Sequence, residues 1–170
     1  EAGDFEAGDR IMLQRDSFDD GSRVPLKTSG RVNETQDTTE DPDLALPDKM
    51  TSELAEFLGY FMGNGHVSDE INVGVECVVD SDATELHSYL SDLGERLFGV
   101  TPTTESQAVD QVLSFRGSQL SQYFEDNGWT KADTGHSGNA AAAAAFIPEQ
   151  VLKGDKQIVK AFLRGVFEAT

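Results

Sequence analysis

Basic residues, cysteine and long apolar runs are all scarce in this 170-residue chain. Its 13 lysine and arginine residues stand against 31 aspartate and glutamate residues, so the formal net charge is -18 at pH 7. Such a charge disfavours binding to nucleic acid, because phosphate contacts normally come from clustered Lys and Arg. It also destabilises a compact state through self-repulsion when the salt concentration is low.

The acidic excess has two interpretations. It can serve solubility alone, or it can belong to a halophilic protein that works in strong salt. At about 1 M salt the Debye length falls to roughly 3 Å, which screens most of the repulsion. The scarcity of lysine favours the halophilic interpretation, and in molar salt the argument against nucleic-acid binding weakens.

Cys77 is the single cysteine, so a disulfide within the chain is excluded. It lies in the strand-like run INVGVECVVD, where we expect a buried apolar side chain, with a nucleophile as the alternative. Neither a signal peptide nor an apolar run long enough to span a bilayer is found in the sequence. We therefore expect an intracellular, cytoplasmic protein without a membrane partner, whose natural start precedes Glu1.

The composition changes twice along the chain. Residues 1–27 carry turn signals and short strand-like runs, and we expect them to be the end of another unit. Residues 28–47 are rich in Thr, Asp, Glu and Pro and predict a linker. Residues 48–170 alternate helical and strand patterns, which predicts an α+β domain with an antiparallel sheet.

Capping residues and apolar periodicity place the elements of this domain. We expect helices that begin at Thr51 or Ser52, at Asp82, at Ser118, at Glu149 and after Asp155. We expect strands over residues 71–79, 100–105 and 111–115.

Two helical segments carry small residues four positions apart. EFLGYFMGNG contains Gly59 and Gly63, and FLRGVFEAT contains Gly165 and Ala169. A glycine inside a helix costs about 1 kcal/mol relative to alanine, so a compensating contact is expected. Small residues at this spacing let two helix backbones approach closely. We expect the two helices to pack through these faces; the alternative is two unrelated core helices.

The same two segments resemble the paired motifs of LAGLIDADG homing endonucleases, especially those embedded in inteins. In that family glycine is third in the motif and an acidic residue is eighth. Here Gly59 and Gly165 take the third place, whereas Asn64 and Thr170 take the eighth. FIPEQVL resembles the segment before the second motif, AGDFEAGDRI resembles a strand late in the amino-terminal splicing half, and the acidic composition suggests a haloarchaeal-like relative.

The resemblance implies a fold. Members of the family form αββαββα units whose motif helices pack at a pseudo-twofold axis. Residues 1–27 would be the end of the all-β splicing (Hint) half, residues 28–47 a linker, and residues 48–170 the first half of the endonuclease domain plus its second motif helix.

The resemblance also implies an activity, namely cleavage of double-stranded DNA at the intein-less allele by part of a self-splicing protein. The partners would be that DNA, the host exteins and the rest of the intein. Two motif acids hold Mg²⁺, which activates water and stabilises the reacting oxygens. Here the metal would lie at Asn64 and Gly65, with Thr170 as the second catalytic position. An amide brings no charge and a hydroxyl is a poor ligand, so we expect weak or absent Mg²⁺ binding and little or no nuclease activity.

Other parts of the family pattern are thin. DNA contacts would come from the sheet, with Arg116 and Lys131 as candidates, whereas Trp129 is expected to be a core lid rather than a stacking platform. Splicing needs a Cys or Ser start, a Thr-x-x-His element and a terminal His-Asn, and Glu1 is no such nucleophile. Two alternatives stay open: a structural insert that supports splicing without DNA binding, and an unrelated α+β domain that dimerises through its glycine helices.

Overall fold

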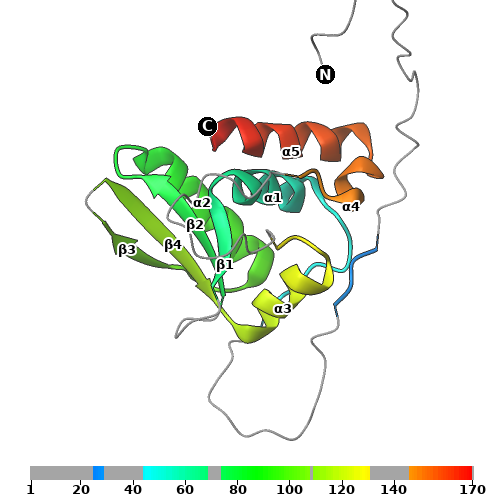
Figure 1. Cartoon of the computed structure of the whole chain (residues 1–170), viewed down its shortest axis with the longest axis horizontal. Coiled ribbons are helices and arrows are strands. Elements are labelled where there is room, and N and C mark those ends of the chain that lie inside the picture. The colour runs from blue at the N-terminus through cyan, green and yellow to red at the C-terminus, as the bar shows by residue number, and fades with distance from the viewer. Residues whose placement is uncertain (1–24, 29–43, 69–73, 108, 131–145, 170) are drawn as a thin grey trace, which may run out of the picture.

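A computed structural model describes residues 25–28, 44–68, 74–107, 109–130 and 146–169 (Figure 1). The elements follow in the order α1 (Ser52–Asn64), β1 (Gly65–Ser68), β2 (Gly74–Asp80), α2 (Thr84–Phe98), β3 (Thr103–Ser106), β4 (Asp110–Arg116), α3 (Ser118–Asp126), α4 (Glu149–Leu152) and α5 (Lys156–Glu168). The strands form one antiparallel sheet in the order β1-β2-β4-β3. The predicted α+β class is confirmed.

Helix caps account for two of the predicted starts and correct a third. Thr51 caps α1 by accepting a hydrogen bond from the Leu54 N–H, and Asp155 caps α5 by accepting from Gln157 and Ile158. The expected cap at Asp82 is wrong. Its N–H donates to the side chain of Asp80 in the turn after β2, and α2 begins one residue later, after Ala83.

The strand predictions were right in kind and incomplete in number. β2, β3 and β4 overlap the three expected strands, although β3 starts at Thr103 rather than at residue 100. β1 was not expected, because GHVS is too short to show alternation. It becomes a strand through pairing with β2, where Gly65 lies opposite Cys77 and Ser68 opposite Gly74.

The core lies between one face of the sheet and the helices. Alternate residues of β2 and β4 point into it: Val75, Cys77, Val79, Leu113 and Phe115. Edge-to-face aromatic contacts bind the layers, since the Phe57 ring lies 5.1 Å from that of Phe98 and 5.5 Å from that of Phe115. Cys77 is fully buried, as predicted.

Short pieces of the expected first unit and linker touch this core. Leu26 is buried, and its N–H donates to the Asp48 carbonyl. The N–H of Ala45 donates to the Phe98 carbonyl, and the Tyr123 hydroxyl donates to the Pro47 carbonyl. The remainder of residues 1–47 lies outside the described residues, so the proposed domain division stays a prediction.

The described helices are too short and too polar for a membrane span.

Candidate functional site

Helices α1 and α5 lie side by side with their backbones in contact (Figure 1). A Cβ atom added to Gly59 would collide with the carbonyl oxygen of Phe162 and lie 3.0 Å from the Val166 nitrogen. A Cβ atom added to Gly165 would collide with the carbonyl oxygen of Glu56 and lie 2.7 Å from the Tyr60 nitrogen. These obstacles are backbone atoms, so only glycine fits at either position.

The contacts between the two helices are reciprocal. Gly59 meets Phe162 and Val166 of α5, while Gly165 meets Glu56 and Tyr60 of α1. The same sequence offset separates Gly59 from Gly165, Glu56 from Phe162, and Tyr60 from Val166. Reciprocal contact between equivalent positions is the signature of a two-fold relation. The two helices are therefore related by a local pseudo-dyad.

The carboxyl ends of α1 and α5 meet at Asn64. Its amide Nδ2 donates to the Ala169 carbonyl across 2.9 Å, and Gly63 packs on the Cβ atom of Ala169. Asn64 is exposed, whereas Gly65 is buried against the Phe61 ring. Thr170, the second predicted catalytic position, lies outside the described residues.

The donor set at these helix ends does not fit Mg²⁺. Mg²⁺ prefers charged oxygen ligands in octahedral geometry. Among the described residues, no three His, Cys, Asp or Glu side chains are grouped so that they could hold a metal ion. Asn64 brings only a neutral amide, and its nitrogen already holds Ala169. Gly65 has no side chain to offer, so no hydrolytic step through a metal follows from this geometry.

Tyr60 lies in α1 one turn before Asn64. Its hydroxyl donates to the Val78 carbonyl at 2.8 Å and so joins α1 to β2. Burial raises the pKa of the Tyr60 phenol to about 12, an effect that a hydrogen bond from Asn64 partly offsets. The phenol therefore stays protonated at neutral pH and acts as a structural donor, not as a base.

The sheet face opposite the core carries mainly negative charge. Residues directly across the ladder share a face, which places Asp80 beside Asp110 and Glu105 beside Val112. Glu76 also lies on this face. Its basic residue in β4 is Arg116, which is exposed and has Nη2 4.0 Å from Glu105 Oε1. The face therefore presents four carboxylates and one guanidinium from its described strands. The other predicted DNA contact, Lys131, lies outside the described residues.

A polar row crosses the same face. His66 Nε2 lies 2.9 Å from Glu76 Oε2, and the Ser114 hydroxyl donates to Glu76 Oε1 at 3.1 Å. In a hydrolytic triad the histidine lies between the acid and the nucleophile. Here the carboxylate takes the middle place, so Ser114 has no base in this row, and the row serves to pin three strands together.

A Thr-x-x-His spacing occurs at Thr84 to His87, which sequence reasoning overlooked. These residues form the first turn of α2, and His87 Nε2 lies 3.2 Å from Thr104 Oγ1 of β3. His87 thus joins a helix to a strand of this domain. This contact gives it a structural place in the α+β fold rather than one beside a splice junction.

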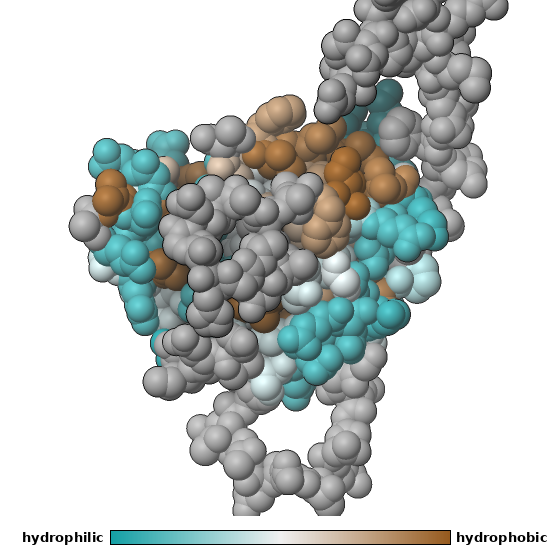
Figure 2. Space-filling model, in the orientation of Figure 1, coloured by the Kyte–Doolittle hydropathy of each residue, from teal (hydrophilic) through white to brown (hydrophobic). Residues whose placement is uncertain are grey.

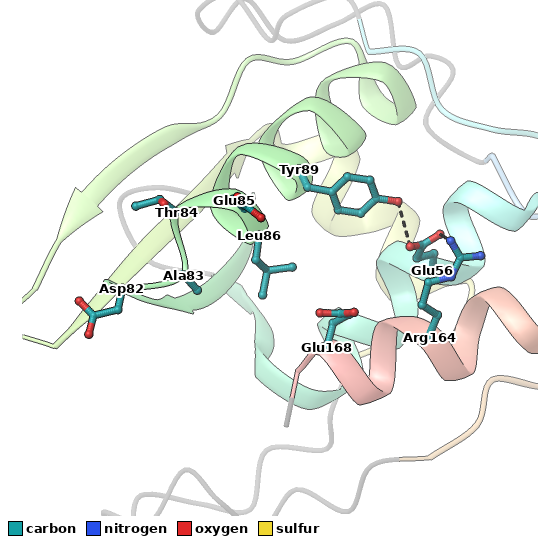
Figure 3. A pocket seen from close by; sticks show the side chains of 9 residues that line it. All are labelled: Glu56, Asp82, Ala83, Thr84, Glu85, Leu86, Tyr89, Arg164 and Glu168. Atoms are coloured by element: carbon teal, nitrogen blue, oxygen red, sulfur yellow. Dashed lines mark hydrogen bonds and ion pairs between the residues drawn. The ribbon is translucent and has the colours of Figure 1, made fainter.

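An open groove lies between α2 and the α1–α5 pair (Figure 3). Glu56 stands at its inner edge, with its side chain 12% exposed; it accepts a hydrogen bond from the Tyr89 hydroxyl at 2.9 Å and pairs with Arg164 at 3.5 Å. Burial, followed by the bond to Glu56, raises the pKa of Tyr89. The three side chains come from α1, α2 and α5, so they lock these helices together. Sequence reasoning missed this cluster, because its members are far apart in the chain.

Comparison with known proteins gives a distant similarity. No family model matches the chain. It is 24% identical over 163 residues to the A component of the A-type ATP synthase of Pyrococcus abyssi (strain GE5 / Orsay), a match that covers 96% of this chain and 14% of that protein. The chain thus spans about one seventh of its relative. Its sequence lacks the Gly-x-x-x-x-Gly-Lys-Ser/Thr pattern of a phosphate-binding loop.

Proposed function

We propose that this chain is an intein segment that carries a LAGLIDADG-type endonuclease half-domain with no nuclease activity of its own. The observation that carries the proposal is the reciprocal glycine contact of α1 and α5, which brings the two motif ends together at Asn64 and Ala169. The order αββαββα from α1 to α3 agrees with the fold that the resemblance implies.

The similarity to an ATP synthase component supports an inserted element rather than ATPase chemistry. The matched portion is a small part of a much longer protein, and this chain has no phosphate-binding loop. We infer that the similarity reflects a segment placed inside a host protein. The partners would then be the host exteins and the rest of the intein, in a cytoplasmic protein.

Loss of nuclease activity is proposed on two grounds. The motif end at Asn64 supplies no carboxylate, and the sheet face along which DNA would lie has four carboxylates against Arg116. Mg²⁺ is therefore not expected to bind at the helix ends. The domain would persist as a structural insert of the intein.

Dimerisation through the glycine helices is less well supported. The small faces of α1 and α5 are already occupied by each other within one chain. A second copy would find them inaccessible.

The intein assignment is tested by reading the coding sequence on both sides of this segment. We expect a Cys or Ser start with its own Thr-x-x-His element upstream, and a His-Asn pair downstream. Flanks without these elements would remove the splicing assignment and leave a free-standing α+β domain.

The DNA assignment is tested by binding of the full chain to a mixed-sequence duplex across a salt series, with Mg²⁺ present. The wild-type chain should bind more weakly than roughly 10⁻⁴ M, the weak end of non-specific binding, and should leave the duplex uncut. A Glu105→Lys, Asp110→Lys variant should bind about tenfold more tightly at low salt and still not cut, because Asn64 is unchanged.

A matched variant controls for net charge. Glu85→Lys, Asp92→Lys makes the same charge change on α2, away from the sheet strands, and we expect it to gain much less affinity. Equal gains by both variants would mean that the sheet face is not where DNA lies. Cutting of the duplex by the wild-type chain would overturn the inactive state.

A further inference from the structure

Exposed apolar side chains gather on the last two helices. Six large hydrophobic residues are exposed among the described ones, and four lie between residues 147 and 167: Ile147, Leu152, Leu163 and Phe167. Phe167 is 74% exposed, the largest fraction of the six. Figure 2 shows the brown surface gathered over α5 and α4. Exposed apolar side chains that cluster in this way mark an interaction site more often than scattered ones do.

The outward side of α5 has a defined pattern. Lys156, Lys160, Leu163 and Phe167 recur at spacings of three and four, so they form one stripe. All four are exposed, while Ile158, Ala161 and Gly165 face α1 and the core. The first half of the stripe is basic and the second half is apolar, which makes the stripe complementary to itself when reversed.

The pseudo-dyad gives an independent indication that this stripe is built for burial. The offset that relates Gly59 to Gly165 also relates Phe57 to Leu163 and Phe61 to Phe167. Phe57 and Phe61 are fully buried in the core under α1, whereas their counterparts on α5 face solvent.

We propose that a second copy of this chain covers the outward stripe of α5, through antiparallel pairing of the two α5 helices. With Leu163 of both copies near the centre, Lys160 of each copy lies against the ring of Phe167 of the other. A lysine over an aromatic face is attractive, and the apolar halves bury each other. This inference goes beyond the proposed function and does not depend on it.

Salt dependence distinguishes this dimer from an electrostatic one. Two chains of net charge -18 repel each other, and this repulsion is largely screened at about 1 M salt. Association through Leu163 and Phe167 should therefore strengthen as KCl is raised. An association held by ion pairs would weaken instead.

The test is sedimentation equilibrium of the full chain over a KCl series, with circular dichroism to confirm folding at each point. We expect a mass of twice 18.4 kDa in molar KCl. Phe167→Glu should raise the dissociation constant about tenfold or more, because a buried phenylalanine is lost. Val109→Glu, at a site 68% exposed and outside the stripe, should leave it unchanged.

Orientation is read from a crosslink. Leu163→Cys should form a disulfide between copies under mild oxidation, while the wild-type chain should not, since Cys77 is buried. A monomer at every salt concentration would overturn the proposal and leave the stripe to a different partner. A dimer that survives Phe167→Glu unchanged would overturn it as well.

Discussion

Replacing Gly59 with alanine should lower the free energy of unfolding by about 1–3 kcal/mol or more, the cost of forcing atoms into a packed site. The sign is diagnostic, because the same change inside an ordinary helix gains about 1 kcal/mol. At Gly59 the added Cβ atom meets the carbonyl oxygen of Phe162, which no rotamer change can move. The helices must separate. Urea unfolding followed by circular dichroism measures the change.

Gly165→Ala should behave in the same way, since its Cβ atom meets the Glu56 carbonyl. The double variant should lose less than the sum of the single losses, because the first substitution already separates the helices. Gly128→Ala is the matched control: its Cβ atom meets nothing within 4 Å, so its cost is limited to that of a left-handed φ of 71°. Stabilisation by Gly59→Ala would contradict the close approach of α1 and α5.

Replacing Trp129 with alanine should cost about 3–5 kcal/mol, the usual loss for a buried tryptophan. Trp129 is fully buried, and its ring makes edge-to-face contacts with Tyr123 at 5.2 Å and Phe124 at 5.3 Å. Its Nε1–H donates to Gln150 Oε1, and the Gln150 amide donates to the Asn127 carbonyl. The indole thus fastens α3 to α4, ahead of α5.

The measurement is again chemical unfolding followed by circular dichroism, since the variant loses the sole tryptophan fluorophore. Trp129→Phe should lose less, because it keeps an aromatic ring and gives up the bond to Gln150. Val109→Ala, on an exposed side chain, should change stability by less than about 0.5 kcal/mol. A loss below about 1 kcal/mol for Trp129→Ala would mean that the indole is not part of the core.

Local signals in the sequence were enough to predict several features. The caps at Thr51 and Asp155, the burial of Cys77 and the core position of Trp129 follow from capping chemistry, strand pattern and hydrophobicity. The spacing of Gly59 and Gly63 pointed to a close helix contact before any partner was known. Each of these predictions depends on residues near one another in the chain.

Features that depend on tertiary contacts were missed. β1 exists because β2 pairs with it, and its four residues show no alternation of their own. Asp82 has the chemistry of a cap, yet the turn after β2 engages its N–H first. The cluster of Glu56, Tyr89 and Arg164 joins three helices, and no spacing rule connects these positions.

The pseudo-dyad and the helix tip at Asn64 are under unequal constraints. A change at Gly59 or Gly165 is opposed by main-chain atoms, so a neighbouring side chain cannot compensate for it. Asn64 is exposed, and its hydrogen bond to α5 is with a carbonyl that water can satisfy equally well. Substitution at the tip is therefore nearly free in folding terms, whatever it does to chemistry. A lineage of such domains can exchange its catalytic side chains without unfolding, so inactive members should be common among chains that keep both glycines.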